Sequence, residues 1–129
     1  VGAMPESDSE LVPSINSLEE LEDHDGTWRR FVNDQLVGPY AEIGRMLDYL
    51  IFLRVPDLAA VRRWRLEQEM ERAIEQRMGP DAIDRFVQHF ERTTLSMART
   101  LPRRADLVVG LLPDHSVSSM AFGSQSKST

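Results

Sequence analysis

A short apolar run that leads directly into a long, arginine-rich helical pattern constrains this fold more than any other feature. Residues 49–55 are mostly β-branched, aromatic or aliphatic, which predicts a strand. Pro56 and Asp57 supply a turn and a helix N-cap, and the pattern is helical from Leu58 to Met78, just before Gly79. The sequence therefore predicts a strand that feeds into a helix.

This predicted helix has two different faces. At about 100° per residue, Arg62, Arg65 and Arg72 fall within an arc of roughly 80°. Apolar residues recur every four positions on another side, at Leu66, Met70, Ile74 and Met78. One face can therefore pack against the protein, and the other can meet anions.

Turn and cap residues divide the rest of the chain into short elements. We expect a mobile or extended lead-in over 1–16, which contributes little to packing, and a disordered tail over 123–129. Between them lies one domain, 17–122, that begins with a capping box at Ser17. Its other elements are helices over 27–36, up to residue 46 and over 82–100, and strands over 107–112 and 117–122. The last helix should place Ile83, Phe86, Val87, Phe90, Leu95 and Met97 inside.

Composition excludes several classes of function. The chain has 129 residues and a net charge of −6, which argues against general nucleic-acid binding. It has no cysteine, so disulfides, thiolate metal sites and cysteine nucleophiles are excluded. The sequence shows neither an apolar run of membrane-spanning length nor a signal peptide. We therefore expect a cytoplasmic protein with neither a nucleic-acid nor a membrane partner.

Residues 57–69, Asp-Leu-Ala-Ala-Val-Arg-Arg-Trp-Arg-Leu-Glu-Gln-Glu, resemble a segment of D-glycerate 3-kinase and of related uridine-kinase-like and phosphoribulokinase-like P-loop kinases. Segments 15–19, 25–36, 85–94 and 103–109 are also similar to parts of these kinases, in the same order. The resemblance covers roughly residues 1–117. It implies an α/β fold, namely the C-terminal part of a three-layer P-loop domain with a parallel sheet.

The phosphate-binding loop of that family is missing. The chain contains no G-x-x-x-x-G-K-[ST], the loop that cradles nucleotide phosphates and helps to hold Mg²⁺. It does not begin with Met, and Val1-Gly2-Ala3 resembles the end of a mid-chain strand of the kinases. We therefore expect the C-terminal half of an ATP-dependent kinase, inactive alone, whose missing half supplies the sites for ATP and Mg²⁺.

The candidate site residues are mainly arginines, whose planar forks suit phosphate oxygens. The resemblance places Arg65 and Arg62 on the lid side of the nucleotide, as catalytic residues, and Arg103 and Arg104 near the adenine. It places Arg29, Arg30 and Asn33 beside the acceptor pocket, where glycerate, a sugar or a nucleoside would each fit. The alternative is a solvated helix face with intrahelical ion pairs for Arg62 and Arg65, and surface roles for the others.

Other polar groups favour structural roles. The acidic run 19–25 matches no metal motif and is expected to be a solvated helix end, so we predict no metal site. His89 lies between Phe86 and Phe90, which favours a partly buried histidine over a general base.

Two alternatives to a kinase fragment remain open. A non-enzymatic helical interaction module would use the apolar stripe of the long helix. A DNA-binding helical domain would use its arginines, against the acidic balance of the chain. If half of a parallel sheet is missing, Leu50, Phe52, Leu107 and Val109 should be exposed, and the chain should bind the missing half or self-associate.

Overall fold

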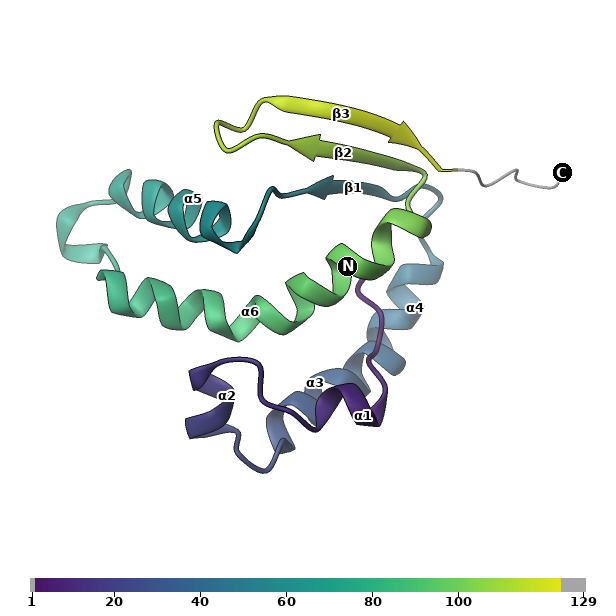
Figure 1. The fold of residues 1–129 in the computed structure, drawn as a ribbon, viewed down its shortest axis with the longest axis horizontal. Coiled ribbons are helices and arrows are strands. Elements are labelled where there is room, and N and C mark those ends of the chain that lie inside the picture. The colour runs from purple at the N-terminus through teal and green to yellow at the C-terminus, as the bar shows by residue number, and fades with distance from the viewer. Residues whose placement is uncertain (1, 124–129) are drawn as a thin grey trace, which may run out of the picture.

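The computed structural model describes residues 2–123, and the predicted tail over 124–129 lies outside them. The elements are α1 (Asp8–Leu11), α2 (Ser17–Glu22), α3 (Thr27–Val37), α4 (Pro39–Arg45), β1 (Ile51–Arg54), α5 (Leu58–Met70), η1 (Ile74–Gln76), α6 (Pro80–Thr100), η2 (Leu101–Arg103), β2 (Leu107–Leu111) and β3 (Val117–Phe122) (Figure 1). The protein is thus of mixed α/β class, rich in helix, with one small sheet. None of the helices within residues 2–123 combines the length and apolar character needed to cross a membrane.

The sheet is mixed and has the order β1-β2-β3. Strands β1 and β2 are parallel, with Ile51 opposite Leu107, and the helical hairpin of α5 and α6 makes the crossover between them. Strand β3 returns antiparallel to β2. A Cβ at Gly110, where these two strands approach, would meet the hydroxyls of Ser118 and Ser119, so a larger residue there would require both serine side chains to turn away.

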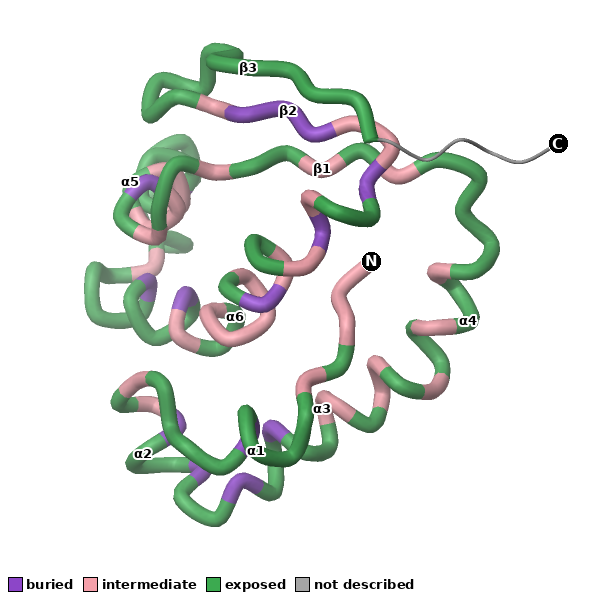
Figure 2. Tube along the Cα trace, turned by 45° about the vertical axis from the view of Figure 1, so that its right-hand side comes forward, coloured by how far each residue is buried: buried purple, intermediate pink, exposed green. Residues whose placement is uncertain are grey.

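All the helices lie on the β1 side of the sheet, and β3 is farthest from them (Figure 1). Buried residues lie on β2, along α6 and in a further group around α1, α2 and α3, whereas β3 is exposed throughout (Figure 2). The buried apolar residues within the described chain are Leu11, Ala60, Ile83, Val87, Leu101, Ala105, Val108 and Val109. This core is small for a chain of this length, so much apolar surface stays exposed.

Arg92 on α6 binds the N-terminal segment, residues 2–16, to the rest of the protein. Its Nε and one terminal nitrogen donate to the two carboxylate oxygens of Glu19, each at 2.7 Å. The remaining N–H groups reach the Glu6 carboxylate at 3.3 Å and the carbonyls of Glu10 and Pro13 at 2.9 and 2.7 Å. All five guanidinium donors are therefore used, and both side chains of the main pair are nearly buried.

The N-terminal segment was wrongly expected to contribute little to packing. It contains the one-turn helix α1, and Leu11 at the end of that helix is only 3% exposed. The cap of α2 is also one residue earlier than predicted, because the side chain of Asn16, not of Ser17, accepts the Glu19 N–H at 3.0 Å.

The predicted helix 58–78 is also wrong in its second half. Helix α5 ends at Met70, and the chain turns through η1 before α6 begins at Pro80. The apolar stripe is therefore broken, and Met70 and Ile74 are 57% and 75% exposed. On α6, Ile83 and Val87 are buried as expected, but Phe86, Phe90 and Leu95 are exposed.

The apolar strand surface that stays exposed differs from the expected one. Val109 is buried and Leu50, Phe52 and Leu107 are half-buried, whereas Ile51 and Leu53 on β1 are 59% and 57% exposed. Strand side chains alternate between faces, so Ile51 and Leu53 share a face of the free edge strand.

We predict that Arg92→Ala lowers the free energy of unfolding by about 2–4 kcal/mol, because it leaves the nearly buried Glu19 carboxylate unpaired. The matched control is Arg99→Ala on the same helix, whose side chain is 56% exposed and pairs with Glu6 at 3.3 Å. It should cost less than about 1 kcal/mol. Urea unfolding of both variants measures the difference, and equal losses would contradict the assigned role of Arg92.

The pH dependence of stability provides a second test. Burial opposes the ionisation of Glu19, but hydrogen bonds from Arg92 and from the Ile15 N–H outweigh it and hold the pKa of Glu19 below its ordinary value of 4.5. A lowered folded-state pKa means that the stabilisation is complete above about pH 4.5 and is lost as the pH falls through the folded-state pKa.

We expect Glu19→Gln to be less stable than the parent at pH 7, and the gap between them to narrow progressively below about pH 4.5. Urea unfolding at several pH values measures the gap. Glu20→Gln, at an exposed position one residue away, serves as the control. A gap between Glu19→Gln and the parent that stays constant down to pH 3 would show that the Glu19 charge is not coupled to folding.

Candidate functional site

The hairpin of α5 and α6 holds the two arginines that the sequence proposes as catalytic. The N-cap Asp57 starts α5 by accepting the Ala60 N–H at 2.7 Å. About two turns after this cap, Arg65 donates to the Glu69 carboxylate at 2.6 Å and to the Gln68 side chain at 2.5 Å. Its guanidinium also lies over the Phe86 ring of α6, with 4.7 Å between Cζ and the ring centroid.

Glu69 anchors this arrangement, and only 1% of its surface is exposed. Its carboxylate accepts the Met78 N–H at 3.1 Å and a 3.3 Å hydrogen bond from Arg72, in addition to the bond from Arg65. The hydrogen bond from the Met78 N–H, with those from the arginines, lowers the pKa of Glu69 against the effect of burial. One carboxylate thus holds two arginines and the return of the chain from α5 toward α6.

Arg62 is held by a different acid. It donates to Asp84 of α6 at 3.0 Å, and both side chains are about half exposed. Arg62 and Arg65 therefore each contact a carboxylate, and an incoming anion would have to compete with these acids. The Arg65 Nε is buried and has no hydrogen-bond partner within the described chain.

Two of the three predicted acceptor residues hold the N-terminal segment instead. Arg29 is 5% exposed and donates to the carbonyls of Leu11 and Val12 at 2.5 and 2.9 Å and to Asp23 at 3.2 Å. Asn33 exchanges two hydrogen bonds with the backbone of Glu6, at 2.7 and 3.1 Å. These contacts favour structural roles for Arg29 and Asn33.

The remaining predicted arginines lie near the surface. Arg30 donates to the carbonyl of Asp25 at 2.6 Å and is exposed, so it remains accessible to a ligand. Arg103 is exposed in η2, and Arg104 next to it donates to the Gly2 carbonyl at 3.2 Å. Figures 1 and 2 show α6 between α5 and α3, so the predicted catalytic and acceptor residues lie on different sides of one helix.

The acidic run of α2 is only partly solvated, which corrects the prediction. Glu19 and Asp23 are buried because they pair with Arg92 and Arg29. Within residues 2–123, no group of three or more His, Asp or Glu side chains is arranged to hold a metal ion.

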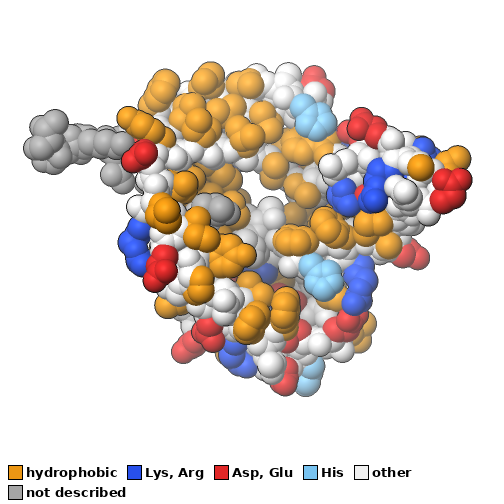
Figure 3. Space-filling view, turned by 180° about the vertical axis from the view of Figure 1, so that it is seen from behind, with side chains coloured by type: hydrophobic (Ala, Val, Ile, Leu, Met, Phe, Trp, Pro, Cys, Tyr) orange, Lys and Arg blue, Asp and Glu red, His pale blue; other side chains and the backbone are white. Residues whose placement is uncertain are grey.

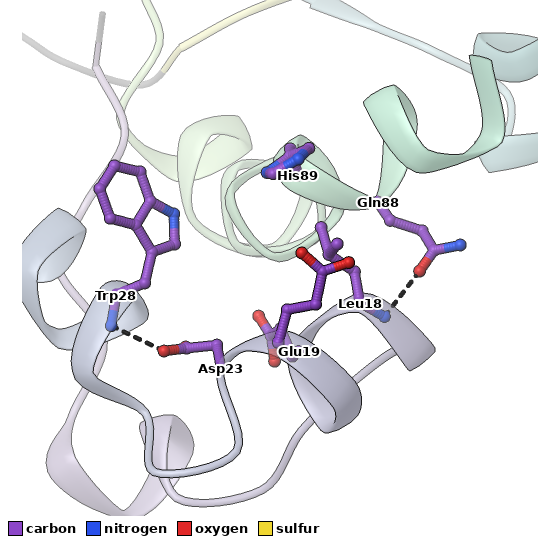
Figure 4. Close-up of a pocket in the computed structure, with 7 residues that line it drawn as sticks. Leu18, Glu19, Asp23, Trp28, Gln88 and His89 are labelled. Carbon is purple, nitrogen blue, oxygen red and sulfur yellow. Dashed lines mark hydrogen bonds between the residues drawn. The ribbon is translucent and has the colours of Figure 1, made fainter. Parts of the chain in front are cut away.

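These acids border a small pocket between α2, α3 and α6 (Figure 4). Gln88 accepts the Leu18 N–H at 2.9 Å and Asp23 accepts the Trp28 N–H at 2.7 Å, while His89 lies across the pocket. His89 is exposed here, which corrects the expectation of a partly buried residue. The pocket holds only about 160 Å³, which is too small for a metabolite of ordinary size.

The alternative of an intrahelical ion pair between Arg65 and Glu69 is confirmed, but sequence reasoning missed the role of Arg92 and the wider anchoring role of Glu69. Glu69 had a detectable signal, because it lies four residues after Arg65 and three before Arg72, where helical side chains meet. Arg92 had none, because its partners are over seventy residues away in the sequence.

Comparisons with protein-family models, with curated proteins and with solved structures find no match to this chain.

We predict that Glu69→Ala frees Arg65 and Arg72 and loosens the connection between α5 and α6. The amide of Met78 loses its acceptor, so its hydrogen exchange, followed by NMR, should become much faster. Glu67→Ala is the matched control, because Glu67 is exposed and lies 3.8 Å from Arg63. It should leave Met78 unchanged. If the hydrogen exchange of the Met78 amide is unchanged in Glu69→Ala, Glu69 does not anchor the connection between α5 and α6.

Proposed function

We propose that this chain forms the lid and acceptor part of an ATP-dependent kinase that phosphorylates a hydroxyl group of a small metabolite. The observation that carries the proposal is the arginine-bearing hairpin between parallel strands β1 and β2. In open parallel sheets, ligands bind beyond the carboxyl ends of the strands, and α5 starts directly after that end of β1. The resemblance of residues 57–69 to P-loop kinases concerns the same element.

The exposed edge of the sheet supports this proposal. Parallel strands normally occur in larger sheets with both faces covered. Here β1 is an edge strand with exposed Ile51 and Leu53, and all of β3 is exposed. Further polypeptide that pairs with β1 would cover this apolar surface. A three-layer P-loop domain is one architecture that would do so.

The residues of this chain do not by themselves fit ATP or Mg²⁺. The sequence has no phosphate-binding loop, and residues 2–123 contain no acid cluster suited to a cation. The proposal therefore assigns both sites to further polypeptide. To this chain it assigns Arg65 and Arg62 as groups that meet an anion, Arg103 and Arg104 as contacts to the nucleotide, and Arg30 as the remaining acceptor contact.

A second candidate is a helical interaction module without enzymatic activity. The observation that favours it is the exposed apolar surface of the helices, including Phe31 and Phe90 at 51% and 55%. A surface of this kind is typical of protein interfaces. This candidate predicts a complex with a partner but no phosphoryl transfer.

The test fuses this chain behind the phosphate-loop segment of a D-glycerate 3-kinase. D-glycerate, a sugar and a nucleoside are offered with ATP and Mg²⁺, and product formation is measured. We expect the fusion, but not the chain alone, to phosphorylate one of the three. A folded fusion that binds ATP but phosphorylates none of the three compounds would contradict the kinase proposal. The interaction module would then be the remaining candidate function.

In an active fusion, Arg65→Ala should lower kcat by roughly 100-fold, as expected for a preorganised charge that acts mainly in the transition state. Arg65→Lys should rescue poorly, because a point charge does not replace a planar fork. The control is Arg63→Ala, an exposed arginine two positions earlier. A kcat for Arg65→Ala within about threefold of the parent, with a lowered Tm, would assign Arg65 a structural role.

A further inference from the structure

Hydrophobic side chains gather around the centre of the rear face of the molecule (Figure 3). A cavity of about 680 Å³ lies between α3, α4, α6 and residues 2–3. We call it the aromatic hollow. Its volume lies within the range that is typical of small-molecule sites, roughly 300–1,000 Å³.

Aromatic rings from three helices line the aromatic hollow. On α3, Trp28 and Phe31 are stacked, with 5.5 Å between their ring centroids. On α6, Phe86 and Phe90 form a tilted pair at 5.1 Å. Tyr40 from α4 completes the lining. Trp28, Phe31, Tyr40 and Phe90 are each at least half exposed, so their rings are available to a ligand.

The lining also contains polar groups without partners. The side chains of Gln35, Tyr40 and Thr93 line the aromatic hollow and make no hydrogen bond within residues 2–123. An amide and two hydroxyls can both donate and accept. A few polar groups among apolar and aromatic ones are what orients a small ligand in a pocket.

The charge of the lining restricts the ligand further. No Asp, Glu, Lys or Arg lines the aromatic hollow, and His89 is the one lining residue that can carry a positive charge. An anionic group that entered it would lose water with only His89 available as a counter-charge, which is costly. A carboxylate or phosphate group is therefore disfavoured inside this cavity.

We propose that the aromatic hollow binds a neutral, planar aromatic small molecule with hydrogen-bonding groups on its edge. The rings of α3 and α6 stack on the ligand, and Gln35, Tyr40 and Thr93 bond its polar edge. The proposal is independent of phosphoryl transfer, because none of the arginines assigned to the kinase lines this cavity.

The test uses a matched pair of probes, indole-3-carboxamide and indole-3-carboxylate, and the two tryptophans of the full chain as reporters. Trp28 lines the aromatic hollow, whereas Trp64 donates its indole N–H to Pro113 at 2.8 Å and stacks on His115. Their indole N–H signals are followed by NMR during titration. We expect the carboxamide to shift the Trp28 signal alone, saturably, with a Kd of roughly a millimolar or tighter.

The carboxylate should bind at least about tenfold more weakly than the carboxamide. Thr93→Val, which removes one hydroxyl, should weaken carboxamide binding by roughly threefold to tenfold, and Thr93→Phe, which fills the space, should abolish it. Thr94→Val on the same helix does not line the aromatic hollow and should change nothing. An unshifted Trp64 signal shows that each variant is folded.

Three results would overturn the proposal. The first is a Trp28 shift that does not saturate or that Thr93→Phe leaves intact. The second is equal binding of the two probes. The third is a Trp28 signal that moves with protein concentration in the absence of a probe, together with dimer formation in sedimentation, because a second copy of the chain would then fill the aromatic hollow.

Discussion

The ion pair between Arg92 and Glu19 is the interaction on which the arrangement of the helices depends. It joins α6 to α2 and, through the contacts with Glu6, Glu10 and Pro13, to the whole N-terminal segment. Glu6 in turn exchanges hydrogen bonds with Asn33 of α3. A nearly buried arginine is stable only when its donors are satisfied, so these contacts have to form together. Because the apolar core is small, charged pairs of this kind have an unusually large part in positioning the helices.

A buried carboxylate that pairs with arginines also organises the hairpin that carries the proposed catalytic arginines. Glu69 holds Arg65 and Arg72 while it accepts the backbone N–H of Met78, so the positions of the side chains and the path of the chain are fixed together. Such a pairing orients a guanidinium but also neutralises it. Binding of an anion at Arg65 would therefore require part of this network to rearrange.

Much of the fold could be predicted from local sequence. The strand near 51–54, the start of α5 at Leu58 and the turn before α6 were all predicted, because caps, prolines and periodicity act over a few residues. The end of α5 was not predicted, because apolar residues keep the helical spacing from Leu66 to Met78 although the chain leaves the helix after Met70. The candidate site was predicted less well. Arg29 and Asn33 look like ligand contacts in the sequence, but their partners are backbone groups of a segment that has no periodic pattern.

The sequence by itself determined where helices and strands begin, that the chain lacks a phosphate-binding loop, and that no cysteine chemistry is present. These properties depend on residue type and short-range spacing alone. Only the tertiary structure decided which arginines are committed to carboxylates, which face of β1 stays exposed and how aromatic rings of α3, α4 and α6 enclose one hollow. Each of these depends on contacts between residues far apart in the chain, and no local pattern encodes the direction in which two helices bring their side chains together.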